Sequence, residues 1–512
     1  MPRLKHLLVL SILLITGCKV GPNFHPAKPP VTEYTSKPLP QRTLSVPVPG
    51  GKSQEFIPGG DIPFQWWTLF RSPEIDLLIC RGLSNSPNLE AAQAALRQAQ
   101  ENLKAEIGAG LVPSIQSNFS VTRQQQPGAT YGVQNFPNSI FTLYNASVSA
   151  NYTLDLFGGI RRQIEAVGAQ VDFERYELLG AYLSLTSNIV TTAVNLASIE
   201  AQIAETGKLI KAQAGSLKIL RLQYNLGGTA LANVETQATL LAQTQATLPP
   251  LQKNLEVLKD SLTALVGALP SESNLPDIDL DRLHLPEQLP ISLPSKLVEQ
   301  RPDVQAAAAL VHQASAQIGV ATANLLPQIN LSADLGSSAL NLNQLFSAQA
   351  EAWRLMGEVT QTVFNGGALL FQRRAAIAAF QQAAAQYQQT VLTAFQNVAD
   401  SLNAIVIDAR NLQAQVAAEN AAKKNLDITW KQYKLGGIPY LSVLEAQQQY
   451  EQIVIARIQA QAARYSDTAA LFQSLGGGWW NLNKEPQMVT SLMPLPPSPP
   501  PASLLISKSK ES

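Results

Sequence analysis

RLQYNLGG at residues 221–228 and WKQYKLGG at residues 430–437 are two copies of one short pattern. Each copy has a tyrosine, a leucine and two glycines in the same order: Tyr224, Leu226, Gly227 and Gly228 in the first, and Tyr433, Leu435, Gly436 and Gly437 in the second. Such a repeat within one chain predicts a repeated architecture, provided that other segments recur at the same spacing.

Three further pairs of segments recur in the same chain order, each separated by about 210 residues. They are LVPSIQSNFS at 111–120 with LLPQINLSAD at 325–334, DLFGGI at 155–160 with VFNGGA at 363–368, and SPNLEAA at 86–92 with RPDVQAA at 301–307. Four matches in register indicate a duplicated half rather than chance similarity. We therefore expect two repeats, residues 73–270 and residues 294–478, joined by a linker over residues 271–293.

The composition is that of a long chain with few charges and no excess of either sign. Of the 512 residues, 37 are Lys or Arg and 37 are Asp or Glu, so the formal net charge is zero. A neutral balance suggests no strongly basic or acidic partner, and we expect no nucleic acid. Charged residues make up 14% of the chain, against about 25% in ordinary soluble domains. Alanine and glutamine, both good helix formers, are abundant instead, so we expect long helices with weakly charged faces.

The N-terminal residues have the pattern of an export signal. Arg3 and Lys5 precede an apolar run over residues 7–15, which is too short to span a bilayer as a helix. Small residues and then Cys18 follow, so residues 1–17 are predicted to be a signal peptide. The stretch before Cys18 resembles a bacterial lipobox, in which the cysteine becomes the lipidated first residue. An ordinary signal peptide with an incidental cysteine is the alternative. The lysine after Cys18 favours sorting to the outer membrane, and we expect no cofactor other than this covalent lipid.

Proline-rich segments flank the two repeats. Residues 18–72 are expected to form an extended strap, and residues 479–512 a disordered tail. Cys80 follows an apolar run in PEIDLLIC and is predicted to be a packed helix residue. Once Cys18 carries lipid, Cys80 has no partner, so we expect no disulfide framework.

Four segments alternate between apolar and polar residues, which predicts strands with one apolar face. They lie at about residues 115–123, 145–156, 328–336 and 353–364, and the last of them carries Trp353, Leu355, Val359 and Val363 on its apolar side. Alternation over about nine to eleven residues suits a membrane β-barrel, whose apolar face meets lipid. A soluble antiparallel sheet with one solvent-exposed face would show the same pattern. The export signal favours the membrane barrel over this alternative.

Four strands are too few to close a barrel within one chain. The smallest single-chain membrane barrels have about eight strands. Open strand edges are excluded from lipid, because each unpaired backbone group there costs several kcal/mol. If these strands lie in a membrane, subunits must therefore share one barrel, and three subunits would give twelve strands. The segments over residues 124–144 and 337–350 would then form the outer loops.

Two stretches without proline, residues 159–226 and residues 367–435, have a helical pattern throughout. At 1.5 Å per residue, each predicts a helix roughly 100 Å long. A helix of this length needs neighbours along it to stay packed. Shorter helices stacked end to end can supply them: residues 88–109 with 229–247 for the first, and residues 297–324 with 442–475 for the second.

Each YxLGG copy is expected to end one of these long helices, because glycine readily adopts the left-handed conformation of a helix C-terminus. The chain then reverses into a return helix, for which Ser442 and Glu445 fit a capping box in the second copy. We therefore expect two helical-hairpin tips, at about residues 224–230 and 433–440, at the end farthest from the strands. A plain turn without a partner is the alternative. Exposed loops carry function more often than the scaffold does, which favours a docking surface.

Together these motifs resemble one family, the TolC-like outer membrane factors, in the NodT-type lipoprotein branch of efflux channels. The matching segments are CKVGPNF at 18–24, QWWTLFRSPEIDLLI at 65–79, SNSPNLEAAQAALRQAQ at 84–100, LVPSI, LLPQI, DLFGGIRRQ at 155–163, RPDVQAAAALV at 301–311 and the two tips. The resemblance implies a mainly α chain that forms a homotrimer, with a shared twelve-strand β-barrel in the outer membrane and an α-helical tunnel in the periplasm. It also implies a periplasmic adaptor protein and an inner-membrane efflux pump, met at the tips.

The resemblance also suggests a gate. Members of this family close the tunnel near the periplasmic tip with acidic side chains, and Asp427 lies about two and a half turns before Gly436. Asp427 is therefore a candidate gate residue, and a solvated surface aspartate is an equal alternative. Pro249 and Pro250 depart from the second repeat and are expected to break the first return helix.

Three rival functions are less well supported. The four histidines form no ligand-spaced cluster, and no nucleophile elbow or phosphate loop is present, so we do not expect an enzyme. His312 is predicted to be a helix-packing residue. A structural lipoprotein spacer would need no alternating strands. A protein-export duct of the type I secretion kind would have the same architecture with another inner-membrane partner, and the lipoprotein resemblance favours efflux.

Overall fold

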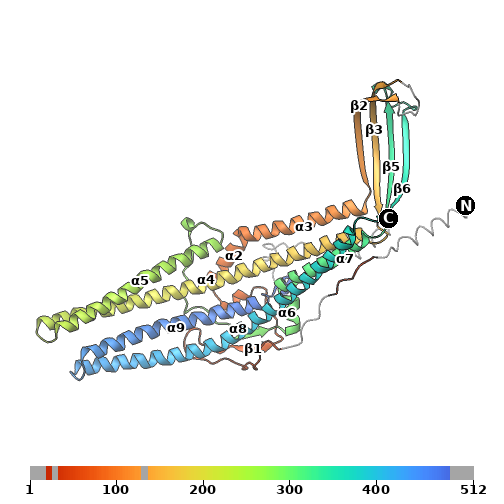
Figure 1. The fold of residues 1–512 in the computed structure, drawn as a ribbon. Helices are drawn as coiled ribbons and strands as arrows, with labels where there is room; N and C mark the ends of the chain where they lie inside the picture. Colours follow the sequence, from red (N-terminus) through yellow and green to blue (C-terminus); the bar gives the residue numbers. More distant parts are fainter. Residues whose placement is uncertain (1–18, 26–32, 129–136, 485–512) are drawn as a thin grey trace.

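The computed structural model, which describes residues 19–25, 33–128 and 137–484, shows an elongated molecule (Figure 1). A small sheet stands at one end, and two helical hairpins extend away from it. Among the residues that the structure describes, no helix combines the length and the apolar character needed to cross a bilayer.

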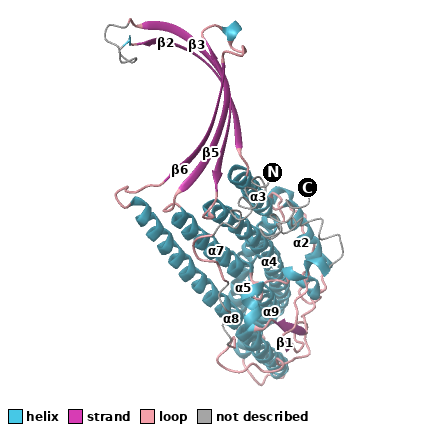
Figure 2. Ribbon diagram, turned by 90° about the vertical axis from the view of Figure 1, so that its right-hand side faces the viewer, coloured by secondary structure: helices cyan, strands magenta, loops and turns pink. Residues whose placement is uncertain are grey.

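The sheet consists of β2 (Ser114–Gln126), β3 (Ser139–Leu154), β5 (Gln328–Ala339) and β6 (Glu351–Thr360), in the order β2-β3-β5-β6. All neighbouring strands are antiparallel, and the sheet twists strongly along its length (Figure 2). The last strand is shorter than its alternation predicts, because β6 ends at Thr360 and leaves Val363 outside the ladder. The glycines that turn the chain into the next helix follow there, at Gly366 and Gly367 with positive φ.

The strand register places apolar residues of all four strands on one face. Ile115 pairs with Ala150, Ala150 with Ala333, and Ala333 with Leu355. The adjacent row, on the opposite face, is polar and runs through Gln116, Ser149, Asp334 and Arg354. Because neighbouring strands keep their side-chain alternation in step, the sheet has one apolar and one polar face.

The two long helices are as long as the sequence predicts. They are α4 (Gly159–Asn225) and α8 (Ala368–Lys434), each of 67 residues. At 1.5 Å per residue each extends about 100 Å. Gly158 and Gly367 precede them in the left-handed conformation, which explains the glycine pair at the start of each helix.

The return helices are α5 (Leu231–Leu265) and α9 (Tyr440–Ser474). Two predictions about them were wrong. Helix α5 continues through Pro249 and Pro250, which are exposed, so that water can hydrogen-bond the carbonyls that proline leaves unpaired. Helix α9 begins at Tyr440 with Pro439 at its N-cap and no side-chain cap, so Ser442 lies inside the helix rather than at its cap.

Shorter helices continue the return helices toward the sheet (Figure 1). Helices α2 (Pro73–Asn85) and α3 (Pro87–Leu111) pack on α4, and α7 (Pro302–Ala323), which follows α6 (Pro294–Gln300), packs on both α4 and α8. The predicted helix over residues 297–324 is therefore two helices. Arg301 separates them in an extended conformation, as expected for a residue that precedes proline.

The N-terminal strap folds back across the helices. Strand β1 (Glu55–Pro58) pairs in parallel with β4 (Gln288–Ile291) of the linker between the repeats. Among the described residues, the remaining elements are the short 3-10 helices η1 (Trp66–Phe70), η3 (Pro270–Glu272), η4 (Leu342–Gln344) and η5 (Trp479–Lys484). Residues 479–484 were expected to belong to a disordered tail, but Trp479 donates a hydrogen bond to the Gln300 carbonyl at 2.6 Å.

The main core surrounds η1 and α2. Trp66, Phe64 and Phe70 are fully buried there, and Trp66 packs against Phe472 of α9. Cys80 was predicted to be a packed helix residue, but it is exposed and lies outside this core. The buried positions of α2 are Ile75, Leu78, Ile79, Gly82 and Leu83, which define one helical face, and residue 80 points away from it.

Helices α8 and α9 bring two carboxyl groups together. Asp408 and Asp467 lie beside Arg464, and the Oδ2 atom of Asp408 is enclosed without a hydrogen-bond partner. Burial, and then the neighbouring Asp467, raise the pKa of Asp408 to about 7. A raised pKa means that the folded chain binds this proton more readily than the unfolded chain. The contribution of protonated Asp408 to the free energy of unfolding is therefore present below pH 4 and is lost as the pH rises toward 7.

Substitution of Asp408 by asparagine should remove this pH dependence. We expect the free energy of unfolding to rise by about 1–2 kcal/mol at pH 8 and to stay nearly unchanged at pH 4, allowing for the partial exposure of the side chain. Thermal unfolding at both pH values measures the effect. Asp400→Asn, at an exposed position of the same helix, is the control. An equal pH slope in Asp408→Asn and the wild type would contradict the prediction.

Candidate functional site

The two tips have the same backbone geometry. Gly227 and Gly436 have φ of +68° and +75°. The next glycine donates its N–H to a carbonyl five residues earlier, from Gly228 to Gln223 at 2.7 Å and from Gly437 to Gln432 at 2.9 Å. This left-handed glycine followed by a six-to-one hydrogen bond is a Schellman motif. The predicted role of the glycines in ending the long helices is therefore confirmed.

An exposed leucine stands at each tip. Leu226 and Leu435 are both 87% exposed, and no atom lies within 4 Å of the Cβ position at either Gly227 or Gly436. The two tips lie side by side at the end of the molecule farthest from the sheet (Figure 1). Exposed apolar side chains of this kind are typical of protein interaction sites, and docking at the tips stays a prediction.

The two tyrosines of the repeated pattern have different surroundings. Tyr224 is 43% exposed. Tyr433 packs edge-on against Trp430 and Tyr440, with ring centroids 6.0 and 5.0 Å away, and its hydroxyl donates to the Gln223 side chain at 3.3 Å. Tyr433, one of the eight residues predicted for the tips, therefore helps to hold the two tips together.

Residues outside the repeated pattern join the hairpins. The hydroxyl of Tyr440 donates to Gln237 of α5 at 2.8 Å, and Tyr440 is buried with Leu217 and Leu220 of α4. The sequence analysis missed Trp430 and Tyr440. The sequence signals them only by a difference between the two copies. The first copy has Arg221 and Leu231, which are not aromatic, at the equivalent positions.

Asp427 is on α8, near its C-terminal end, and its side chain is exposed. Its role in the gate stays a prediction.

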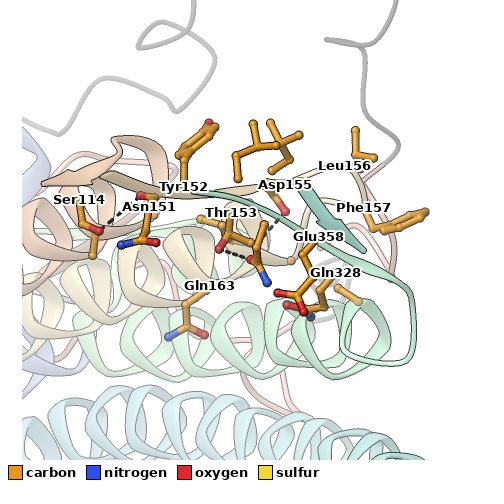
Figure 3. Close-up of a pocket in the computed structure, with 18 of the residues that line it drawn as sticks. Ser114, Asn151, Tyr152, Thr153, Asp155, Leu156, Phe157, Gln163, Gln328 and Glu358 are labelled. Carbon is orange, nitrogen blue, oxygen red and sulfur yellow. Dashed lines mark hydrogen bonds between the residues drawn. The ribbon is translucent and has the colours of Figure 1, made fainter. Parts of the chain in front are cut away.

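A polar hollow lies where the sheet meets the helices (Figure 3). Its lining comes from strands β2, β3, β5 and β6 and from the ends of α3, α4 and α7. Asn151, Thr153, Gln163, Gln328 and Glu358 are among the lining side chains. Thr153 donates to Asn330 at 2.8 Å across β3 and β5. These polar groups favour a hollow filled with water over one that binds an apolar ligand.

Asp155 organises the start of α4 beside this hollow. Its carboxylate accepts hydrogen bonds from the backbone N–H groups of Ile160 and Arg161, both at 3.0 Å, and from Nε of Arg161 at 3.0 Å. A carboxylate at a helix N-terminus satisfies free donors and favours the helix dipole. The equivalent residue of the second repeat is Val363, so only the first long helix starts in this way.

Cys18 lies outside the described residues, so its lipidation stays a prediction. Among the described residues, no group of three or more His, Cys, Asp or Glu side chains could hold a metal ion. His312 does pack between helices, as predicted, and contacts Glu165 of α4 at 3.0 Å.

Comparison with known proteins identifies relatives over most of the chain. A family model described as outer membrane efflux protein matches residues 78–268 and 293–477. The pyoverdine export outer membrane protein OpmQ of Pseudomonas aeruginosa is 28% identical over 418 residues, which cover 81% of this chain and 87% of that protein. The cation efflux system protein CusC of Escherichia coli O6:H1 is 24% identical over 473 residues, covering 91% of this chain and 97% of CusC.

The fold also has solved counterparts. The outer-membrane channel OprN superposes with a TM-score of 0.81 at 26% identity, over 90% of this chain and all of that chain. The Campylobacter jejuni outer membrane channel CmeC superposes with a TM-score of 0.80 at 19% identity, over 91% of this chain and 98% of that chain. The predicted resemblance is therefore confirmed, and the chain belongs to the outer membrane efflux protein family.

Proposed function

We propose that this protein is the outer-membrane exit duct of a tripartite efflux system. Three copies form one channel, with a shared barrel in the outer membrane and a helical tunnel in the periplasm. Small molecules pass through it from an inner-membrane pump and a periplasmic adaptor to the outside. The duct itself is passive, and the pump supplies the energy and most of the selectivity.

One observation carries this proposal. The four-stranded sheet has an apolar and a polar face, and within the part of the chain that the structure describes its edge strands, β2 and β6, each pair on one side only. Unpaired strand edges are not tolerated in lipid, so an apolar-faced sheet of this kind needs further strands. Copies of the same chain supply them in a closed ring, with β6 of one subunit beside β2 of the next, and the polar faces then line a water-filled lumen.

The tips are the proposed docking site for the adaptor. Leu226 and Leu435 offer apolar side chains on rigid turns, and the pairing of Tyr433 and Tyr440 with α4 and α5 holds the two turns at a fixed spacing. Asp427 lies on the same part of α8 and is the proposed gate acid. Two apolar side chains at a fixed spacing can bind a helical hairpin of a partner protein, which would pack between them.

Small molecules are the favoured cargo. The relatives include a pyoverdine export protein, a toluene efflux protein and a cation efflux protein, and all three names refer to small solutes. A duct for protein export would have the same barrel and tunnel, so this distinction rests on the relatives rather than on the architecture.

Native mass spectrometry of the protein, extracted from outer membranes in detergent, tests the proposal. We expect a trimer in which each subunit begins at Cys18 and carries the added mass of acyl chains. The same trimer should conduct ions in planar bilayers. A monomer without lipid would contradict the shared barrel, since four strands alone cannot close one. The monomeric state would favour a structural spacer over a channel.

A further inference from the structure

The residues that follow Cys18 are bound in a surface notch at the junction of sheet and helices. Two of the family-like segments meet there: residues 19–24, which follow Cys18, and DLFGGIRRQ at residues 155–163. The Val20 N–H donates to the Phe157 carbonyl at 3.1 Å. Phe157 lies between the end of β3 and the start of α4, so the segment is attached at the helix-side end of the sheet.

Arg162 is the centre of this notch and is 1% exposed. Its guanidinium donates to the carbonyls of Val20 and Gly21 at 3.0 and 3.1 Å and to the side chain of Asn23 at 2.8 Å. A fourth bond, at 2.9 Å, reaches Glu165. Three of these four hydrogen bonds therefore go to the N-terminal segment, and the fourth goes to Glu165 on the same helix.

Glu165 links the segment to both repeats. Its carboxylate forms an ion pair with Lys19, and its Oε1 atom lies 3.0 Å from Nε2 of His312 on α7. Phe24 stacks on the His312 ring, with centroids 4.6 Å apart. Burial would raise the pKa of Glu165, but the bonds from His312, Lys19 and Arg162 hold the pKa at about 2. The carboxylate therefore stays charged across the ordinary pH range.

Three glycines allow the N-terminal segment to lie close to the backbone of the helices. A Cβ atom at Gly21, where φ is +89°, would lie 2.5 Å from Cα of Gly319. A Cβ atom at Gly319 would lie 2.7 Å from Cγ of Arg162, and one at Gly158 would lie 2.9 Å from Cα of Lys19. No real Cβ contact is that short, so each of these three positions requires glycine for the segment to lie where it does.

The duplication supplies an internal comparison. The second repeat keeps the glycine pair at Gly366 and Gly367, but Leu370 stands where the first repeat has Arg162. The chain has one N-terminal segment, and only the repeat that binds it carries the buried arginine. The arginine therefore serves the segment rather than the turn between strand and helix.

We infer that this notch, residues Arg162, Glu165, His312 and Gly319, is a positioning site for the membrane anchor of the chain. It holds the acyl chains of Cys18 at the helix-side edge of the sheet, where they enter the periplasmic leaflet of the outer membrane. This inference rests on the proposed lipidation of Cys18. If residues 19–33 were unattached, a fully extended chain would let the anchor lie up to about 50 Å from Glu33. Because the notch binds the segment from Lys19 onward, Cys18 is only one residue away from a fixed point.

Trypsin cleavage after Lys19 tests the notch in the full-length trimer. Lys28 and Lys37 precede proline, so cleavage there is disfavoured, and intact mass spectrometry detects the loss of acylated Cys18–Lys19. We expect slow cleavage in the wild type and a rate about ten- to hundredfold higher in Arg162→Ala, because proteolysis of a locally opening segment follows the population of the open form. Arg162→Lys should restore part of the protection.

Two further variants separate the notch from the fold. Gly21→Ala changes only the N-terminal segment, so the helices keep their packing, and the same rise in cleavage is expected. Arg161→Ala removes the neighbouring arginine, whose carboxylate partner is Asp155, and should cleave at the wild-type rate. Wild-type protection in both Arg162→Ala and Gly21→Ala trimers would overturn the inference.

The mass of the untreated wild type distinguishes the two proposals. A chain without acyl mass would contradict the lipidation of Cys18, and with it the anchoring role of the notch. A chain with acyl mass that is cut rapidly after Lys19 would leave lipidation intact and overturn the notch alone.

Discussion

Phenylalanine in place of both Gly228 and Gly437 is expected to abolish efflux without reducing the amount of trimer in the membrane. These second glycines of the tips do not have positive φ, and a Cβ atom at either would make an ordinary contact of 3.5 Å with one backbone carbonyl. The turn therefore tolerates a side chain, and only the docking surface changes. Bulky residues at the centre of an interface block close packing, so we expect transport below about a tenth of the wild-type rate.

Accumulation of a fluorescent substrate measures this effect in cells that carry the matching pump and adaptor. Gly436 is less suitable for substitution, because its φ of +75° would add backbone strain of about 1 kcal/mol to the change in surface. Gly215→Phe is the matched control. That glycine is exposed on α4, with no atom within 4 Å of its Cβ position, and lies three turns before the tip. Normal efflux in the double tip variant would refute docking at the tips.

Replacement of Arg464 by alanine should cause the largest loss of stability. This residue of α9 is 1% exposed and donates to the carbonyls of Gly50 and Lys52 at 2.7 and 3.1 Å and to the Gln54 side chain at 3.0 Å. Burial lowers the pKa of Arg464 to about 10, so the guanidinium still carries its charge at neutral pH. Its removal takes this donor from three acceptors of the strap, two of which belong to the buried residues Gly50 and Gln54. Each enclosed acceptor that is left without a donor costs about 1–3 kcal/mol.

We therefore expect the free energy of unfolding to fall by about 3 kcal/mol or more, measured by thermal unfolding of the trimer in detergent. Arg464→Met keeps most of the packed volume and should lose nearly as much, because the lost hydrogen bonds dominate. Arg42→Ala is the control within the same strap. The Arg42 side chain is 64% exposed and pairs with Glu55, and an exposed pair of this kind contributes less than about 1 kcal/mol. Equal stability of Arg464→Ala and Arg42→Ala would contradict the prediction.

The sequence by itself determined the elements whose signals are local. Alternation of period two located all four strands, and continuous helical pattern between glycine pairs gave α4 and α8 to within two residues at each end. The glycines of the tips were readable for the same reason, since a left-handed turn requires glycine at one position. The internal repeat strengthened each of these predictions, because two copies had to share one interpretation.

Predictions that needed the surroundings of a side chain failed or were incomplete. Cys80 was expected to be a packed helix residue and is exposed, because the face that α2 buries depends on which helix it meets. The prolines of α5 were expected to break it, but solvent at that surface tolerates them. Ser442 and Glu445 match a capping box, yet Pro439 occupies the N-cap position and the helix begins at Tyr440, two residues before Ser442.

Only the tertiary structure decided how the two halves and the N-terminal segment are joined. Tyr433 meets Gln223 across 210 residues of sequence, Arg162 meets Gly21 across 141, and Arg464 meets Gln54 across 410. No periodicity within one element encodes such pairs, because each depends on where two distant elements lie after folding. The sequence thus determined a duplicated chain of strands and long helices, and tertiary packing decided which of its repeated residues became joints and which remained exposed for partners.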